Sequence, residues 1–158
     1  MKDGYPEDKE LDMIKTWDIH YVFDLVDFIE SIWWMDDWGM NKKWGVDKYG
    51  HGRHVLYLEL HTGGWSGNEE IIEALLSNTM VKVMGYIQWR IGGHYWFEFT
   101  AESFGYKTSH EFCKEKGFTR QYLFKAKNKF EWIHISKKKR LVREIKPITN
   151  ERLKRKID

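Results

Sequence analysis

Two histidines and two glutamates near the middle of the chain are the residues best suited to chemistry. Glu59 and His61 lie in one segment of alternating apolar and polar residues, and His94 and Glu98 lie in another. Alternation of this kind places every second side chain on one face of a strand, so these residues occupy the polar faces of their strands. Imidazole and carboxylate groups bind divalent metals and transfer protons. A metal or catalytic site, a ligand surface and a solvated antiparallel sheet face are all consistent with the pattern.

A glycine-rich turn over residues 61–70 connects the first of these segments to a helical pattern. Free N–H groups at the start of a helix attract anions, and glycine allows close approach to the backbone. The turn matches neither the phosphate loop of nucleoside triphosphatases nor the dinucleotide fingerprint, and Trp65 could equally well fill the core. We predict no catalytic residue, metal or cofactor. The turn and the polar face together form an alternative ligand site: Glu59, His61, Gly63, Gly64, Trp65, Ser66, Asn68, Arg90, His94, Trp96 and Glu98.

Charge is unevenly distributed along the chain. Residues 1–37 carry 11 acidic and 3 basic side chains, whereas residues 107–158 carry 17 basic and 6 acidic side chains, a net charge of +11. Two explanations stay open: the two ends attract each other within the fold or between copies of it, or the basic end faces a polyanion such as nucleic acid.

Residues 110–125 (HEFCKEKGFTRQYLFK) have the spacing of two short crossed helices. Cys113 supplies a small side chain for the crossing, Gly117 suits a turn with positive φ, and Phe118 and Leu123 are apolar where the second helix would face inward. At these positions the segment resembles the helix-turn-helix of phage and bacterial DNA-binding proteins. It departs from that pattern because no clear preceding helix completes a three-helix core.

The resemblance implies that the second helix enters the major groove of double-stranded DNA. Arg120 and Gln121 are long enough to reach base edges from its first turn, and lysines beyond it would contact phosphates. The predicted DNA-binding residues are Thr119, Arg120, Gln121, Lys125, Lys127, Lys129, Lys137, Lys138, Lys139 and Arg140.

Two other stretches, residues 62–69 (TGGWSGNE) and 92–99 (GGHYWFEF), together resemble small uncharacterised phage and prophage proteins. This resemblance implies a mobile-element origin and no known chemistry. The leading role is a DNA-binding accessory protein that uses residues 107–146, and the alternative is a protein-binding inhibitor of a host defence system that uses exposed aromatic residues and the acidic helix. A small phosphate or nucleotide binder, or a metal-dependent phosphoester enzyme, is the third alternative.

The elements that must position these residues follow from the periodicity. The patterns predict helices over residues 18–35, 66–77, 108–116 and 119–129, and strands over 54–62, 80–90, 94–100, 130–136 and 140–145. Residues 36–53 are predicted to form a loop. Ser66 with Glu69, and Thr108 with Glu111, have the spacing of capping boxes. Gly92 and Gly93 are predicted to form a hairpin turn, and residues 137–139 another.

Composition favours a small folded protein without a membrane span. One cysteine in 158 residues excludes a disulfide framework, and an aromatic content of 16% excludes extensive disorder. The fold class expected is α+β, an N-terminal helix on a small, mostly antiparallel sheet (β-α-β-β). The predicted domains are 1–106, a basic helix-turn-helix-like module with a β-hairpin at 107–146, and a basic tail at 147–158. We expect a cytoplasmic protein that pairs with DNA or a host protein, or forms a homodimer.

Overall fold

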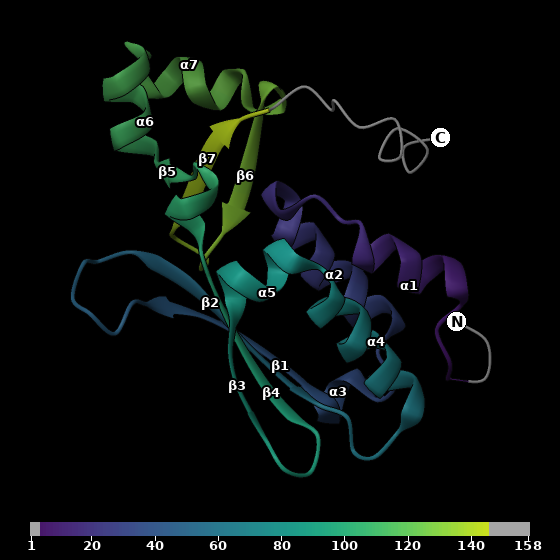
Figure 1. Ribbon diagram of the computed structural model, residues 1–158. Coiled ribbons are helices and arrows are strands. Elements are labelled where there is room, and N and C mark those ends of the chain that lie inside the picture. The colour runs from purple at the N-terminus through teal and green to yellow at the C-terminus, as the bar shows by residue number, and fades with distance from the viewer. Residues whose placement is uncertain (1–3, 146–158) are drawn as a thin grey trace. The chain divides into compact units, whose positions relative to one another are not determined.

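The computed structural model describes residues 4–145 and divides the chain into two compact units (Figure 1). Unit 1 comprises residues 1–104 and unit 2 residues 105–158. The predicted basic tail, residues 147–158, lies outside the described residues. No helix in the described part of the chain has the length and apolar character needed to cross a membrane.

Unit 1 begins with a series of short helices, whereas the sequence predicts a single helix over residues 18–35. They are α1 (Asp8–Lys15), η1 (Ile19–Tyr21), α2 (Val22–Ile32) and α3 (Asp36–Gly39). Asp18 is an N-cap as predicted, but of η1, where its carboxylate accepts the N–H of His20 at 2.9 Å. Helix α2 ends at Ile32 because Trp33 has extended backbone angles, so the predicted end at residue 35 is wrong.

A four-stranded antiparallel sheet forms the rest of unit 1. Its strands are β1 (Met40–Val46), β2 (His54–His61), β3 (Tyr86–Arg90) and β4 (His94–Thr100), in the order β1-β2-β4-β3. The predicted strands over 54–62 and 94–100 are confirmed. Residues 40–46 were predicted to be loop, and the structure shows strand β1 there instead. The sequence lacks an alternating pattern because β1 is an edge strand, paired on one side only, and Asn41, Lys42 and Lys43 are all exposed.

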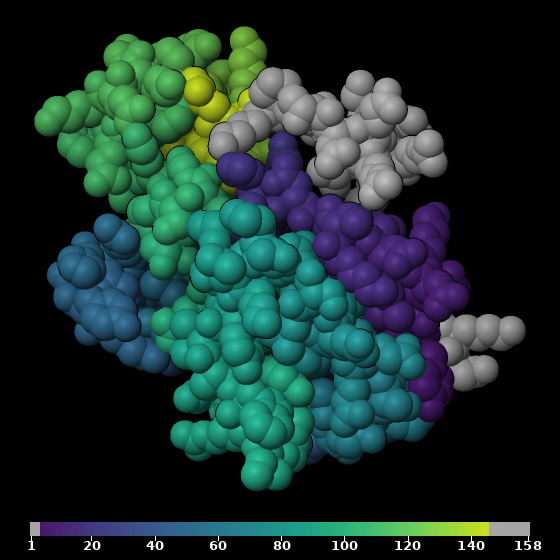
Figure 2. All heavy atoms as spheres, viewed as in Figure 1, coloured from purple at the N-terminus to yellow at the C-terminus, as the bar shows by residue number. Residues whose placement is uncertain are grey.

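Residues 79–90 show the limit of an alternating pattern. The predicted strand over 80–90 is wrong in its first half, which forms α5 (Thr79–Gly85). Asn78 starts this helix, because its side-chain oxygen accepts the N–H of Val81 at 3.3 Å. Asn78 also ends α4 (Ser66–Ser77), whose own N-cap is Trp65; the predicted capping box between Ser66 and Glu69 does not form. Helix α5 and the β3–β4 turn lie at the surface in Figure 2.

The core of unit 1 lies between the helices and one face of the sheet. The leucines of β2 are at most 4% exposed, and Phe97 and Phe99 of β4 are each 1% exposed. Figure 1 shows the helices of unit 1 on one side of the sheet. The opposite face carries the polar side chains of β2 and β4, as the alternation predicts.

Unit 2 combines two helices with a small antiparallel sheet. Its elements are β5 (Lys107–Thr108), α6 (Ser109–Lys116), α7 (Arg120–Lys125), η3 (Lys127–Lys129), β6 (Phe130–His134) and β7 (Arg140–Glu144), with strand order β5-β7-β6. The predicted hairpin over 130–145 is confirmed. Helix α7 ends at Lys125, so the predicted helix to residue 129 is too long.

The inward positions of the helix-turn-helix pattern are confirmed. Gly117 has a φ of +70° in the connection between the helices, and Thr108 and Glu111 form the predicted capping box of α6. Phe112, Cys113 and Leu123 are buried together with Val142 of β7. In the described part of unit 2, the sheet therefore completes the core of α6 and α7. In a three-helix domain, the first helix would occupy that place.

Candidate nucleic-acid interface

The predicted DNA-binding residues of unit 2 are all exposed to solvent. They comprise eight lysines or arginines together with Thr119 and Gln121. Leu123, between them in sequence, is fully buried. Helix α7 therefore packs on the core through one face and leaves the predicted cationic side chains in solvent.

The described part of unit 2 holds few carboxylates that could neutralise these cations, and each of those is engaged elsewhere. The described residues 105–145 contain four acidic side chains, one of which, Glu111, accepts the backbone N–H and the hydroxyl of Thr108 in the capping box. The other three pair with cations outside the predicted set: Glu115 with Lys107, Glu144 with Lys116, and Glu131 with Arg143. No ion pair of the eight predicted cations occurs within residues 4–145.

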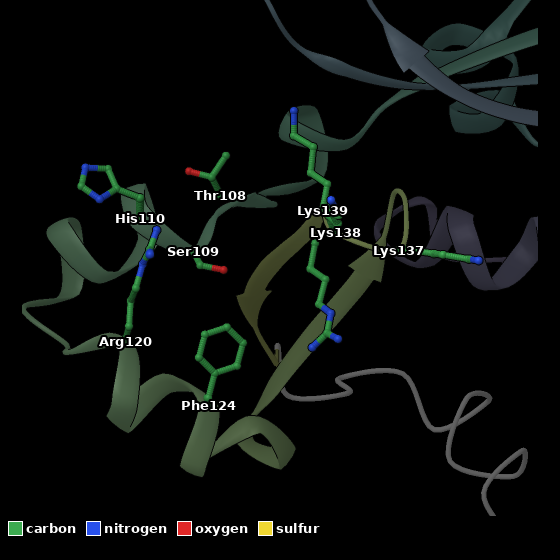
Figure 3. Close-up of a pocket in the computed structure, with 9 residues that line it drawn as sticks. Thr108, Ser109, His110, Arg120, Phe124, Lys137, Lys138 and Lys139 are labelled. Carbon is green, nitrogen blue, oxygen red and sulfur yellow. The ribbon is translucent and has the colours of Figure 1, made fainter.

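A pocket of about 500 Å³ lies on this basic surface (Figure 3). It is bounded by the start of α6, by α7 and by the β6–β7 turn. The residues that line it are Thr108, Ser109, His110, Arg120, Phe124, Lys137, Lys138, Lys139 and Arg140. The fold thus brings five of the predicted residues, Arg120 and residues 137–140, around one hollow. Thr119, Gln121, Lys125, Lys127 and Lys129 do not line it.

Helix α7 presents Arg120 and Phe124 from one face, because residues four apart lie one turn above the other. Figure 3 shows both side chains rising from α7 toward Ser109 and His110. Thr119 has a different task, since its hydroxyl oxygen accepts the N–H of Tyr122 at 3.1 Å and caps the helix. We expect its contribution to any ligand to be indirect.

The β6–β7 turn presents its three lysines by a tight backbone arrangement. Lys139 N–H donates to the carbonyl of Ser136 at 3.2 Å, and Ile135 N–H donates to the carbonyl of Lys139 at 2.9 Å. The intervening side chains must therefore point outward. In Figure 3, Lys137 points away from Arg120 and Phe124.

Four lining residues were absent from the sequence prediction: Thr108, Ser109, His110 and Phe124. Phe124 could have been expected beside Arg120, because residues four positions apart lie on the same face of a helix. The start of α6 could not be assigned in this way, because its position next to the hairpin depends on the pairing of β5 with β7, which are far apart in sequence.

The alternative site on unit 1 is partly assembled. The strand register pairs His61 with His94 and Glu59 with Trp96, so these residues are neighbours on the polar face. The Nδ1 atoms of His61 and His94 are 2.8 Å apart, and the guanidinium of Arg90 lies 5.4 Å from the centre of the Trp96 ring. Glu98 instead pairs with Lys48 at 2.8 Å. Within residues 4–145 no three histidine, cysteine or acidic side chains are grouped to hold a metal.

The polar groups of the glycine-rich turn are engaged within the protein. Asn68 is buried, and its amide both accepts from Trp34 N–H at 3.0 Å and donates to Trp34 O at 3.1 Å. Trp65 donates its indole N–H to the carbonyl of Gly4 at 3.0 Å and stacks on Trp34. A pocket of about 250 Å³ beside the turn includes Gly63 and Asn68 of the predicted set, and is otherwise lined by Trp34, Met35, Trp38 and Thr62. Ser66 lies at the exposed end of α4, with its hydroxyl 3.3 Å from that of Tyr5, and Gly64 is exposed.

Comparisons of the chain with protein-family models, with curated proteins and with solved structures gave no match.

The histidine pair makes unit 1 sensitive to pH. Burial lowers the pKa of His61, the neighbouring His94 lowers it further, and Glu59 partly opposes both effects. A folded-state pKa below the unfolded value of about 6.5 means that stability is fully present above that pH and is lost as the pH falls through the folded-state pKa. We expect the urea concentration at the unfolding midpoint of unit 1 to decrease when the pH is lowered from 7 to 5. Hydrogen exchange of β2 and β4 measures this midpoint.

The variant His94→Gln should reduce this pH-dependent loss, because it removes the charge that opposes protonation of His61. His110→Gln, which changes an exposed histidine of unit 2, is the matched control and should leave the loss unchanged. An equal pH dependence in wild type and His94→Gln would contradict the prediction.

Proposed function

We propose that this chain binds double-stranded DNA through unit 2 and performs no catalysis. The observation that carries the proposal is the set of eight exposed lysines and arginines on and after α7, none of them in an ion pair within the described residues. Exposed cations that can meet phosphates are the main source of affinity for the phosphate backbone. On the resemblances noted in the sequence, we assign the protein the role of an accessory factor of a phage or mobile element.

Helix α7 and the hairpin have separate tasks in this proposal. Gln121 is exposed in the first turn of α7 and faces base edges in the major groove, and Arg120 beside it contacts a phosphate. The turn residues 137–140 contact phosphates beside it, as the wing of a winged helix-turn-helix does. Because α7 has six residues and is about 9 Å long, it reads few base pairs. Most of the affinity is therefore expected to be electrostatic.

The experiment measures binding of the full chain to duplex DNA at two salt concentrations, with fluorescence anisotropy as the readout. If Arg120 and residues 137–140 each neutralise one phosphate, a rise from about 50 to about 200 mM salt weakens binding about 500-fold. Absence of binding at the lower salt concentration would overturn the proposal. Binding that is insensitive to salt would also overturn it, because phosphate contacts always release counterions.

Protein binding is a second candidate function, and the edge of the unit 1 sheet favours it. Strand β3 is an edge strand, and Ile87 and Trp89 on it are each 51% exposed, while Ile91 in the following turn is 87% exposed. An apolar edge strand pairs readily with another chain. We propose that this partner is a second copy of the chain, paired antiparallel through β3.

Sedimentation of the chain without DNA tests this candidate. A dimer that dissociates in Trp89→Lys, with Lys82→Ala as a control, would support it, and a monomer at all concentrations would exclude it. Loss of the dimer with retained DNA binding would show that the two functions are separate.

A further inference from the structure

The pocket of unit 2 differs from a surface that only contacts the phosphates of a DNA duplex. Its volume of about 500 Å³ is in the range of pockets that hold small organic ligands, and it is hollowed between three segments. Continuous duplex presents phosphates on a convex surface, which lysines contact without a hollow. A pocket of this size within the proposed interface is suited to a group that projects from the nucleic acid.

An aromatic ring forms part of the pocket wall. Phe124 is 46% exposed and lines the pocket, although it lies on the same helix as the buried Leu123. It stacks on Trp132 with ring centres 5.6 Å apart and planes inclined by 20°. The indole N–H of Trp132 donates to the carbonyl of Lys127 at 3.0 Å, so the supporting ring is itself fixed. A ring held in this way is preorganised to stack a nucleobase.

The rest of the lining suits the remainder of a nucleotide. No acidic side chain is among the residues that line the pocket, and Arg120, Lys138, Lys139 and Arg140 supply positive charge. Ser109 lies opposite Phe124 in Figure 3, and neither Ser109 nor His110 has a side-chain hydrogen bond within the described residues. They are therefore free to bond the edge of a base, while the cations bond its phosphate.

We propose that this pocket binds one unpaired nucleotide, with its base stacked on Phe124 and its phosphate held by the surrounding cations. The inference rests on the proposed DNA binding and specifies the preferred substrate. That substrate is duplex DNA that carries an unpaired nucleotide, as at a single-stranded overhang. A base inside an intact duplex is stacked on both faces and cannot enter the pocket without being flipped out.

The test compares a blunt duplex with the same duplex bearing a short single-stranded overhang, at one salt concentration. We expect the full chain to bind the overhang duplex about tenfold more tightly, which is the typical effect of one stacked base. A fluorescent 2-aminopurine placed in the overhang should be quenched when it stacks on the ring. Phe124→Ala should abolish the preference and the quenching and leave binding to the blunt duplex nearly unchanged.

Two further variants keep the test decisive. Tyr122→Ala removes an aromatic side chain of α7 that is 43% exposed but does not line the pocket, so it should retain the preference. If Phe124→Ala is unstable, Phe124→Leu covers Trp132 but offers no aromatic face, and should also lose the preference. Equal affinity for the two duplexes, or a preference that survives in Phe124→Leu, overturns this inference alone. Absence of binding to either duplex overturns the proposed function as well.

Discussion

The fourfold variant Arg120→Ala, Lys138→Ala, Lys139→Ala, Arg140→Ala is expected to lose at least about 100-fold in affinity for duplex DNA at low salt. The four side chains are exposed, line the pocket of unit 2 and have no ion pair within the described residues. Each lost phosphate contact reduces the dependence of affinity on salt, so the log–log slope should become less negative by about 3.6. Anisotropy titrations over a range of salt concentrations measure both quantities.

A control with the same change in net charge separates a local contact from a general effect of charge. Lys9→Ala, Lys43→Ala, Arg53→Ala and Lys82→Ala together remove four exposed cations of unit 1. This control should keep most of the wild-type affinity and slope. An equal loss in both fourfold variants would show that overall charge, and not the surface of unit 2, is responsible.

Leu123→Ala is expected to unfold unit 2 selectively. Leu123 has no exposed surface and packs with Phe112, Cys113 and Val142 in a small core. Truncation of a buried leucine costs about 2–5 kcal/mol, and a unit with few buried residues has little stability to lose. Hydrogen exchange should show lost protection in α6, α7 and β7 with retained protection in β2 and β4. DNA binding through unit 2 should be lost with it.

Gln121→Ala is the matched control on the same helix, because its side chain is exposed and alanine favours a helix. It should leave exchange unchanged. Full protection of α6 and α7 in Leu123→Ala would contradict the assignment of these residues as the core of unit 2. Simultaneous unfolding of β2 and β4 would show that the two units unfold together.

Local patterns predicted the elements whose determinants lie within a few residues. The alternation over 54–62 and 94–100 became β2 and β4, and Thr108, Glu111 and Gly117 set the start and end of α6 as expected. The pattern failed where long-range contacts decide. Helix α5 replaces the first half of the strand predicted over residues 80–90. The amide of Asn78, which caps this helix, donates to the carbonyls of Ile14 and Trp17, more than 60 positions earlier.

The candidate interface divides in the same way. Arg120 and residues 137–140 were singled out by their charge and by their place in a helix-turn-helix-like pattern. Phe124 was not, because exposed and buried aromatic residues look alike in a sequence. The distinction arises from Trp132 of β6, which supports one side of the ring and leaves the rest of it in the pocket.

The sequence by itself determined the α+β class, the uneven charge, the apolar faces of two central strands and the inward positions of α6 and α7. These features depend on residue type and on spacing along one helix or strand. Only the tertiary structure decided which cations lack a carboxylate partner and which side chains surround a common hollow. Both depend on the pairing of β5, β6 and β7, which brings together residues separated by up to 35 positions, and sequence spacing alone carries no record of such distances.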